Sequence, residues 1–181
     1  MGLYTYDDNS FLRMLIRILV YIAVVISAAW FLVYSYLNQV IVSGNSMAPV
    51  LKADDMCLID RLSYDIGSPK RFDVIAFERN DTGKQNIKRI VGLPGETLQI
   101  MNGRIYINNE PLENPYTDQI SLPGIAENSV VLEENEYFVI GDNADASEDS
   151  RFSNIGNVKK SDMKGKLWLI IKPFNRIGKI E

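Results

Sequence analysis

The sequence predicts a mainly β protein: an antiparallel β-sheet catalytic core with a small inserted β-rich lobe, preceded by one N-terminal transmembrane helix. Three observations lead to this prediction. A long apolar run lies near the N-terminus, short β-prone runs separated by turn residues follow it, and an Asn-Gly pair at Asn102-Gly103 joins two of these runs. Repeated short strands at modest spacing are typical of antiparallel β architecture.

The apolar run has the length of a membrane anchor. No charged residue occurs from Ile18 to Leu51, and residues 18–37 are its most apolar part. A helix of this length spans about 30 Å, the thickness of the hydrocarbon core of a bilayer. The alternatives are a cleaved signal peptide, which is usually shorter, and a buried helix, which would need a large surrounding core.

The charges around the anchor predict its orientation. Arg13 and Arg17 precede the apolar run, whereas the next cation is Lys52. Under the positive-inside rule, residues 1–17 form a cytoplasmic tail and the chain from residue 38 onward lies outside the cell membrane.

The chain beyond the anchor is expected to form strands. The expected strands cover residues 56–59, 74–77, 87–91, 98–100, 104–107, 130–132, 137–140 and 167–171. Asn102-Gly103 supplies the positive φ angles of a type I′ hairpin turn. Residues 38–97 and 136–181 are expected to form the extracytoplasmic catalytic core, and residues 98–135 the inserted lobe.

The composition excludes several classes of function. The 181 residues carry a net charge of −4 and no dense basic stripe, which argues against a nucleic-acid partner. Cys57 is the single cysteine and histidine is absent, so neither an intrachain disulfide nor the common transition-metal sites are expected. Asp54-Asp55 could hold a hard cation but is more typical of a solvated turn, and we expect no metal and no cofactor.

Ser46 is the first candidate for chemistry. It lies in the run Ser43-Gly44-Asn45-Ser46-Met47-Ala48-Pro49, just past the uncharged segment. A constrained turn of this kind can present a serine hydroxyl and leave the backbone N–H free for an oxyanion. The alternative is a turn serine that hydrogen-bonds its own backbone. A nucleophilic serine needs a base, and in a chain without histidine a lysine of lowered pKa is the leading candidate.

Lys88 and Arg89 lie within an expected strand. Strand alternation places Lys88 and Ile90 on one face and Ile87, Arg89 and Val91 on the other. Both faces carry apolar neighbours, so one cation points toward packed surface. Burial disfavours the charged form of a lysine, and a neutral amine can accept a proton. The alternative is two surface cations on an edge strand.

The stretch from Gly141 to Arg151 is the third candidate. It follows an expected strand and contains hydroxyls and carboxylates that could position an amine, with Asp149 and Arg151 able to form an ion pair. The alternatives are a solvated acidic loop and a calcium loop, although the ligand spacing of a calcium loop is absent.

Together these stretches resemble, in order, the motifs of the bacterial type I signal peptidases, membrane-bound serine proteases with a Ser–Lys dyad. The resemblance spans residues 12–181. The matching residues are Ser46-Met47-Ala48-Pro49, Lys88-Arg89 followed by Gly92-Leu93-Pro94-Gly95, and Gly141-Asp142-Asn143 followed by Ser147-Glu148-Asp149-Ser150-Arg151. The chain departs from the family pattern at three positions: it has Phe72 where a glycine often precedes the aspartate, Ala144 where an arginine is often found, and Gly44 where some members carry a hydroxyl.

The resemblance implies roles for individual residues. Ser46 would be the nucleophile and Lys88 the general base, and Ser147 would orient the Lys88 amine. Asp149 and Arg151 would pair to hold the core, and Asp142 would support the loop. The oxyanion would rest on the Ser46 N–H and a second donor, such as the Ser43 hydroxyl or a backbone group. The apolar residues nearest the dyad in sequence are the candidates for a shallow substrate pocket: Val42, Met47, Leu51 and Ile87.

The implied activity is removal of N-terminal signal peptides from exported preproteins, with cleavage after small residues in an Ala-x-Ala pattern. The implied partners are preproteins and the lipid bilayer. Three other functions remain alternatives: a membrane-anchored chaperone or pilus-assembly factor, a soluble self-cleaving Ser–Lys protease of the repressor type, and a carbohydrate- or peptide-binding β module. The two candidate catalytic residues argue against the first, the anchor against the second, and the motif order against the third.

Overall fold

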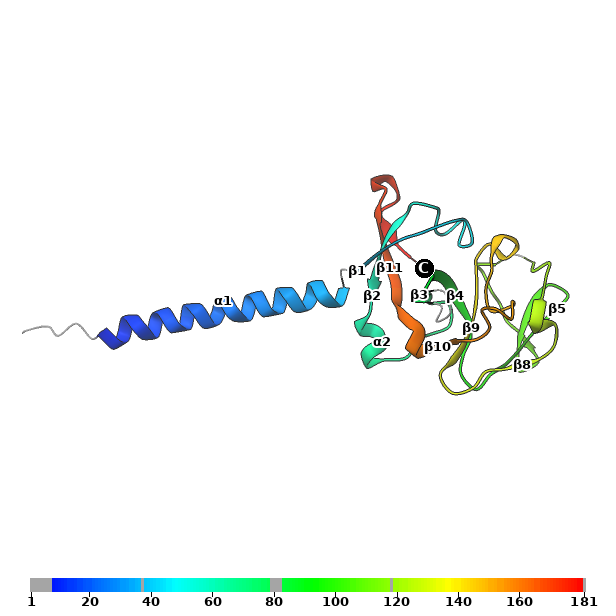
Figure 1. Ribbon diagram of the computed structural model, residues 1–181, viewed down its shortest axis with the longest axis horizontal. Coiled ribbons are helices and arrows are strands. Elements are labelled where there is room, and N and C mark those ends of the chain that lie inside the picture. Colours follow the sequence, from blue (N-terminus) through cyan, green and yellow to red (C-terminus); the bar gives the residue numbers. More distant parts are fainter. Residues whose placement is uncertain (1–7, 37, 79–82, 118, 181) are drawn as a thin grey trace, which may run out of the picture.

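The computed structural model describes residues 8–36, 38–78, 83–117 and 119–180. A long N-terminal helix leads into two antiparallel β-sheets, which confirms the predicted mainly β fold with an inserted lobe (Figure 1). The helix projects from one end of the β region, and the smaller sheet with β5 and β8 lies at the other end (Figure 1).

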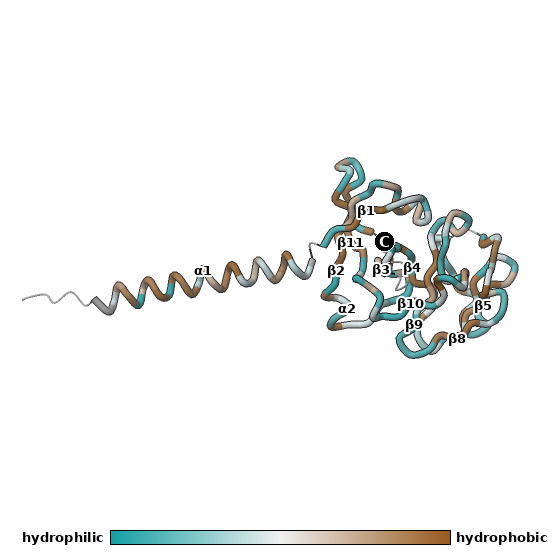
Figure 2. The backbone as a smooth tube through the Cα atoms, viewed as in Figure 1, coloured by the Kyte–Doolittle hydropathy of each residue, from teal (hydrophilic) through white to brown (hydrophobic). Residues whose placement is uncertain are grey.

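Helix α1 (Asp8–Tyr36) is longer than the apolar run that predicted it. It starts ten residues before residue 18, so Arg13 and Arg17 lie within it. Helical hydrogen bonds form regardless of side-chain polarity, so the start of the helix and the start of the apolar stretch need not coincide. Within Ser10–Ser35 an 18-residue stretch has a mean hydropathy of 2.4, so this segment is long and apolar enough to cross a membrane. Apolar residues recur along the whole helix (Figure 2).

The larger sheet forms the core of the β region. Its strand order is β1-β2-β11-β3-β4-β9-β10, with β12 paired to β11, and every pairing is antiparallel. The strands are β1 (Asn38–Ile41), β2 (Met56–Asp60), β3 (Val74–Glu78), β4 (Gln85–Gly92), β9 (Glu136–Ile140), β10 (Val158–Lys159), β11 (Met163–Lys172) and β12 (Gly178–Lys179). The short helix α2 (Leu62–Ile66) follows β2.

The smaller sheet has the order β7-β6-β5-β8. Its strands are β5 (Thr97–Met101), β6 (Arg104–Ile107), β7 (Glu110–Pro111) and β8 (Val130–Val131). Asn102 and Gly103 join β5 to β6 with φ angles of 51° and 76°, which confirms the predicted type I′ turn. Asn108 and Asn109 also have positive φ angles and join β6 to β7. Short 3-10 helices occupy loops of both sheets: η1 (Gly124–Glu127), η2 (Ala144–Ala146), η3 (Lys160–Asp162) and η4 (Phe174–Arg176).

Several elements were not expected from the sequence. Strands β1, β7, β10 and β12 have two to four residues, too few for an alternating pattern. Strand β11 starts at Met163 rather than at residue 167, because Lys164 and Lys166 belong to it. Lys164 pairs with Glu78, the last residue of β3, and Lys166 pairs with Asp73, which precedes β3. These ion pairs stand where the apolar residues that usually predict a strand would be expected.

Two apolar clusters fix the parts of the chain that hold the candidate residues. One contains Met47 and Leu51 and packs them against β2, β3 and β11. The other joins Val91 of β4 and Ile140 of β9 to the apolar residues of the smaller sheet. The turn around Ser46 and the inserted lobe are therefore both packed onto strand β4 or its neighbours.

Candidate active site

Ser46 lies in a tight turn that follows β1. Gly44 has a φ of 81°, a left-handed conformation that glycine adopts without steric cost. The Ala48 N–H donates to the Asn45 carbonyl (3.1 Å), closing the turn. The Ser46 carbonyl accepts a hydrogen bond from the Asn143 N–H (3.0 Å), which ties the turn to the loop after β9. The Ser46 backbone is thus held from two sides.

Lys88 lies in the middle of β4, directly across from Ile75 of β3. Its side chain is only 4% exposed, and its Nζ lies 2.9 Å from Ser46 Oγ. Loss of hydration lowers the pKa of the Lys88 ammonium below its ordinary value of 10.5, while the nearby Asp149 carboxylate opposes this effect. The two atoms are at hydrogen-bond distance across 42 residues of sequence.

Arg89 is more deeply buried and has more partners than the sequence predicts. One cation of the Lys88-Arg89 pair was expected to be buried, and both are. Arg89 donates through Nε and Nη2 to both carboxylate oxygens of Asp142 (2.7 Å each) and through Nη1 to the Phe72 carbonyl (2.9 Å). Its guanidinium also lies 3.6 Å from the ring centroid of Tyr116, a residue of the inserted lobe. Phe72, whose carbonyl joins this network, has a positive φ of 69°.

The loop from Gly141 to Arg151 is organised around a buried ion pair. Arg151 Nε donates to Asp149 Oδ1 (2.7 Å), and the Gly141 N–H donates to Asp149 Oδ2 (3.1 Å). The Ser147 hydroxyl donates to Asp149 Oδ2 (2.6 Å). Arg151 also donates to the Ala144 and Ser147 carbonyls, so the ion pair fixes both ends of the loop.

Gly141 lets this loop approach the Ser46 turn closely. A Cβ atom at position 141 would collide with the Ser46 carbonyl oxygen and with Ser147 Oγ. Ser147 and Ser46 therefore flank the same backbone position. The hydrogen bonds described for this region run from Lys88 to Ser46 and from Ser147 to Asp149, and none joins Ser147 to Lys88 among the described residues.

A depression of about 260 Å³ opens beside Ser46 and Lys88. Of the four apolar residues expected in a substrate pocket, Val42, Met47 and Ile87 line it. Leu51 does not: its N–H donates to the Met47 carbonyl in a helical turn that points its side chain into the core, where it is fully buried. Ser43 is exposed and also lines the depression.

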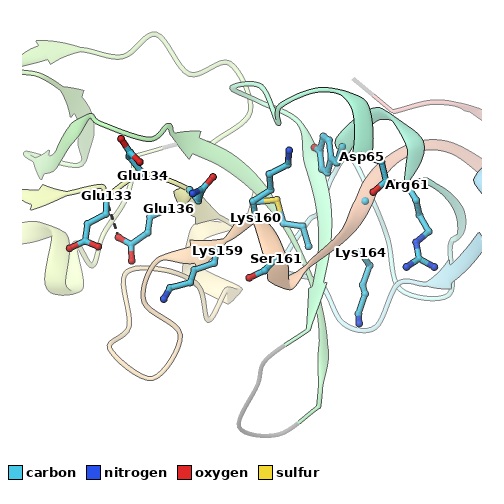
Figure 3. Close-up of a pocket in the computed structure, with 13 residues that line it drawn as sticks. Arg61, Asp65, Glu133, Glu134, Glu136, Lys159, Lys160, Ser161 and Lys164 are labelled. Atoms are coloured by element: carbon cyan, nitrogen blue, oxygen red, sulfur yellow. Dashed lines mark hydrogen bonds between the residues drawn. The ribbon is translucent and has the colours of Figure 1, made fainter.

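A larger pocket, of about 650 Å³, lies elsewhere. It contains neither Ser46 nor Lys88 and is lined mostly by charged residues (Figure 3). Figure 3 shows Glu133, Glu134 and Glu136 at one end and Arg61 and Lys164 at the other. Its Ser161 hydroxyl hydrogen-bonds the neighbouring Asp162 rather than an amine, so this pocket lacks the arrangement found at Ser46.

Asp55 of the Asp54-Asp55 pair forms an ion pair with Arg176. Asp55 is buried and accepts hydrogen bonds from the Arg176 guanidinium and the Lys52 N–H. In the parts of the chain that the structure describes, no group of three or more cysteine, aspartate or glutamate residues could hold a metal ion.

A buried lysine beside a serine on a β scaffold is an arrangement suited to a serine peptidase. The sequence model of the family described as signal peptidase, peptidase S26, matches residues 13–172. The chain belongs to this family, and it is a peptidase of the signal peptidase I type.

Individual relatives in sequence are also signal peptidases I. The signal peptidase I of Leptolyngbya laminosa is 33% identical over 147 residues, covering 77% of this chain and 70% of the relative. That of Bacillus caldolyticus is 33% identical over 153 residues, covering 78% and 82%. A crystal structure of a signal peptidase I from Enterococcus faecalis is 32% identical, covers 55% of this chain and 96% of that one, and has a TM-score of 0.44. The signal peptidases I of Leptolyngbya laminosa and Bacillus caldolyticus, together with helix α1, fit a single-pass membrane protein.

Proposed function

We propose that this chain removes signal peptides from exported preproteins by a Ser–Lys dyad, with Ser46 as the nucleophile and Lys88 as the general base. The observation that carries the proposal is the 2.9 Å distance between Lys88 Nζ and Ser46 Oγ, with the amine almost fully buried. The lowered pKa of Lys88 increases the fraction of neutral amine, the form that can take the proton from the serine.

The reaction proceeds through an acyl-enzyme. Neutral Lys88 accepts the Ser46 proton as Oγ attacks the carbonyl carbon of the scissile peptide bond. The Ser46 N–H and the Ser43 hydroxyl stabilise the oxyanion. Protonated Lys88 then donates to the departing amine and, once neutral again, activates the water that releases the signal peptide. Ser147 orients Lys88: its single proton is directed to Asp149, which leaves an oxygen lone pair to accept from the ammonium.

Cleavage follows small residues in an Ala-x-Ala pattern. The depression beside the dyad is only about 260 Å³, and its apolar residues Val42, Met47 and Ile87 are each less than 9% exposed. The small apolar surface that these residues leave exposed supports binding of methyl-sized side chains and disfavours large ones. Strand β1 is at the end of the sheet order, so an extended peptide could pair along its outer edge.

Helix α1 anchors the enzyme in the cell membrane, with residues 1–17 in the cytoplasm and the β region outside. The uncharged stretch of α1 and the arginines at its start support this orientation. The anchor confines enzyme and membrane-tethered preprotein to one surface, so their encounter requires little additional affinity.

The dyad is tested with Ser46→Ala and Lys88→Ala in the full-length protein in detergent. Each change should lower cleavage of a preprotein by at least about 1,000-fold, because removing either member of such a pair removes most of the chemical catalysis. Circular dichroism should show an unchanged fold.

Ser161→Ala and Lys164→Ala are matched controls, since both residues line the larger pocket away from the dyad. They should retain normal cleavage. Wild-type rates in the Ser46→Ala or Lys88→Ala protein would refute the dyad, and cleavage lost only in the controls would place the activity in the larger pocket.

A further inference from the structure

A second depression, of about 390 Å³, adjoins the Ser46 turn on the side away from the Lys88 pocket. The Ser46 turn and the loop after β9 each contribute residues to both depressions, with neighbouring parts of each segment lining one and then the other. Residues 40–47 line the first and Ala48 and Pro49 the second; likewise Ala146 and Glu148 line the first and residues 142–145 the second. The hydrogen bond from Asn143 to Ser46 connects the two. Tyr116 and Gln119 of the inserted lobe complete the lining of the second depression.

This position relates the second depression to the substrate. Attack by Ser46 divides a peptide into an acyl part and a departing amine, which lie on opposite sides of the nucleophile. If small residues before the cut occupy the first depression, the residues after the cut extend toward the second.

The charge of the second depression comes from one side chain. The charged residues among its described lining are Asp142 and Asp145. Asp142 is buried and neutralised by the two hydrogen bonds from Arg89. Asp145 is exposed, and its described hydrogen bond is a long one (3.4 Å) from the Ser121 hydroxyl. No lysine or arginine belongs to this lining, so the Asp145 carboxylate faces the cavity with its charge uncompensated there.

The part of the wall that Tyr116 and Gln119 form is held in place before any substrate binds. The Tyr116 ring packs over the Arg89 guanidinium at 3.6 Å and contacts the Phe72 ring at a centroid distance of 5.5 Å. Gln119 lies directly over Gly103 in the β5–β6 turn, where a Cβ would collide with it. A preformed cavity of this kind can discriminate between substrates without first being ordered.

We propose that the second depression is a subsite for the first residues of the mature protein, and that Asp145 makes it prefer a basic residue there over an acidic one. This inference rests on the proposed function of the Ser46–Lys88 site and specifies which substrates that site favours.

The test uses full-length enzyme in detergent and three peptides that share one signal sequence and Ala-x-Ala site. Their second residue after the cut is Lys, Gln or Glu. For the wild type, kcat/KM should be about two- to fivefold higher for the Lys than for the Glu peptide, the range expected for one exposed charge pair. Asp145→Asn should bring this ratio close to one, and Asp145→Lys should reverse it. Added salt should reduce the wild-type ratio.

Asp65→Asn is the matched control, because Asp65 is an exposed carboxylate that lines the larger pocket instead. It should keep the wild-type ratio and cleave the Gln peptide at the wild-type rate. Equal kcat/KM for the three peptides with the wild type, or an unchanged ratio in Asp145→Asn, would overturn the subsite while leaving the dyad intact. A wild type that cleaves none of them would overturn the proposed function itself.

Discussion

Lys88 is buried in a strand where the charged form of a lysine lowers the free energy of unfolding. It sits at 4% exposure in a strand whose residues from Ile87 to Gly92 are all buried, and its Nζ is directed to Ser46 rather than to a carboxylate. Taking an ammonium out of water without an ion-pair partner disfavours the charged form, which is why the pKa of Lys88 is lowered. The property that suits Lys88 to act as a base is therefore also a source of instability.

Lys88→Met should consequently stabilise the protein at neutral pH while abolishing activity. The unfolded lysine binds its proton up to about pH 10.5, whereas the folded one loses it earlier. The cost of burial is fully present below the folded pKa and declines as pH rises toward the unfolded value, since the unfolded state then binds more protons. We expect the melting temperature of Lys88→Met to exceed that of the wild type by a few degrees at pH 7, with the gap narrowing toward pH 10.

Lys164→Met serves as the comparison, because Lys164 is half exposed and paired with Glu78. It should show no such stabilisation and no narrowing with pH. Thermal unfolding across this pH range measures both variants, and a Lys88→Met protein that is less stable than the wild type at pH 7 would contradict the argument.

At the scale of elements, the site depends on two loops that approach each other closely. The Ser46 turn and the loop after β9 meet at Gly141, where the neighbouring atoms leave no room for a side chain. The Asp149–Arg151 ion pair holds one loop in shape, and the hydrogen bond from Asn143 to Ser46 joins the two. Strand β4 contributes Lys88 to one side of this contact and Arg89 to the other.

Gly141→Ala should therefore displace Ser46. The new methyl group collides with the Ser46 carbonyl and with Ser147, so one of the loops must move by a fraction of an ångström or more. Misplacement on this scale lowers kcat/KM by about 10- to 100-fold, and overpacking costs about 1–3 kcal/mol of stability.

The control is Gly178→Ala, where a Cβ would meet its nearest neighbour at an ordinary 3.8 Å. It should leave kcat/KM and urea unfolding nearly unchanged. If Gly141→Ala cleaved a preprotein as fast as Gly178→Ala, the close approach of the loops would have no importance for positioning Ser46.

At the scale of the whole molecule, an apolar helix and the β region that holds Ser46 and Lys88 are connected in series. The carbonyl of Ser35 at the end of α1 accepts a hydrogen bond from the Arg61 N–H (3.4 Å), so the helix leads directly into the β region. If α1 spans a membrane as proposed, its orientation decides on which side of that membrane Ser46 and Lys88 lie.

The sole cysteine makes this orientation measurable. Cys57 is fully buried, and burial raises the pKa of its thiol to about 12, so it should react poorly with maleimides. In intact bacterial cells stripped of their wall, a membrane-impermeant maleimide should label Asn128→Cys in the inserted lobe. Ser10→Cys at the start of α1 should be labelled only after lysis. The reverse pattern would place the β region in the cytoplasm.

The sequence alone determined the features that depend on neighbours along the chain. The apolar run located helix α1, although not its first residue, and Asn102-Gly103 predicted a hairpin, because local backbone and solvation preferences suffice for both. The family motifs drew attention to Ser46 and Lys88 before any geometry was known. Short strands such as β1 and β10 escaped prediction because their pairing partners, not their residues, make them strands.

Only the tertiary structure decided how distant residues meet. It paired Arg89 with Asp142 across 53 residues and turned Leu51 into the core. It also directed the hydrogen bond of the Ser147 hydroxyl to Asp149 and placed Asp145 in the lining of a cavity that the inserted lobe helps to build. Side-chain burial and hydrogen bonding depend on which segments pack together, and residue type and spacing do not specify that packing. Residue type and the surrounding motif identify Ser46 as a candidate nucleophile. The environment of its hydroxyl arises from contacts between strands and loops that lie far apart in the chain.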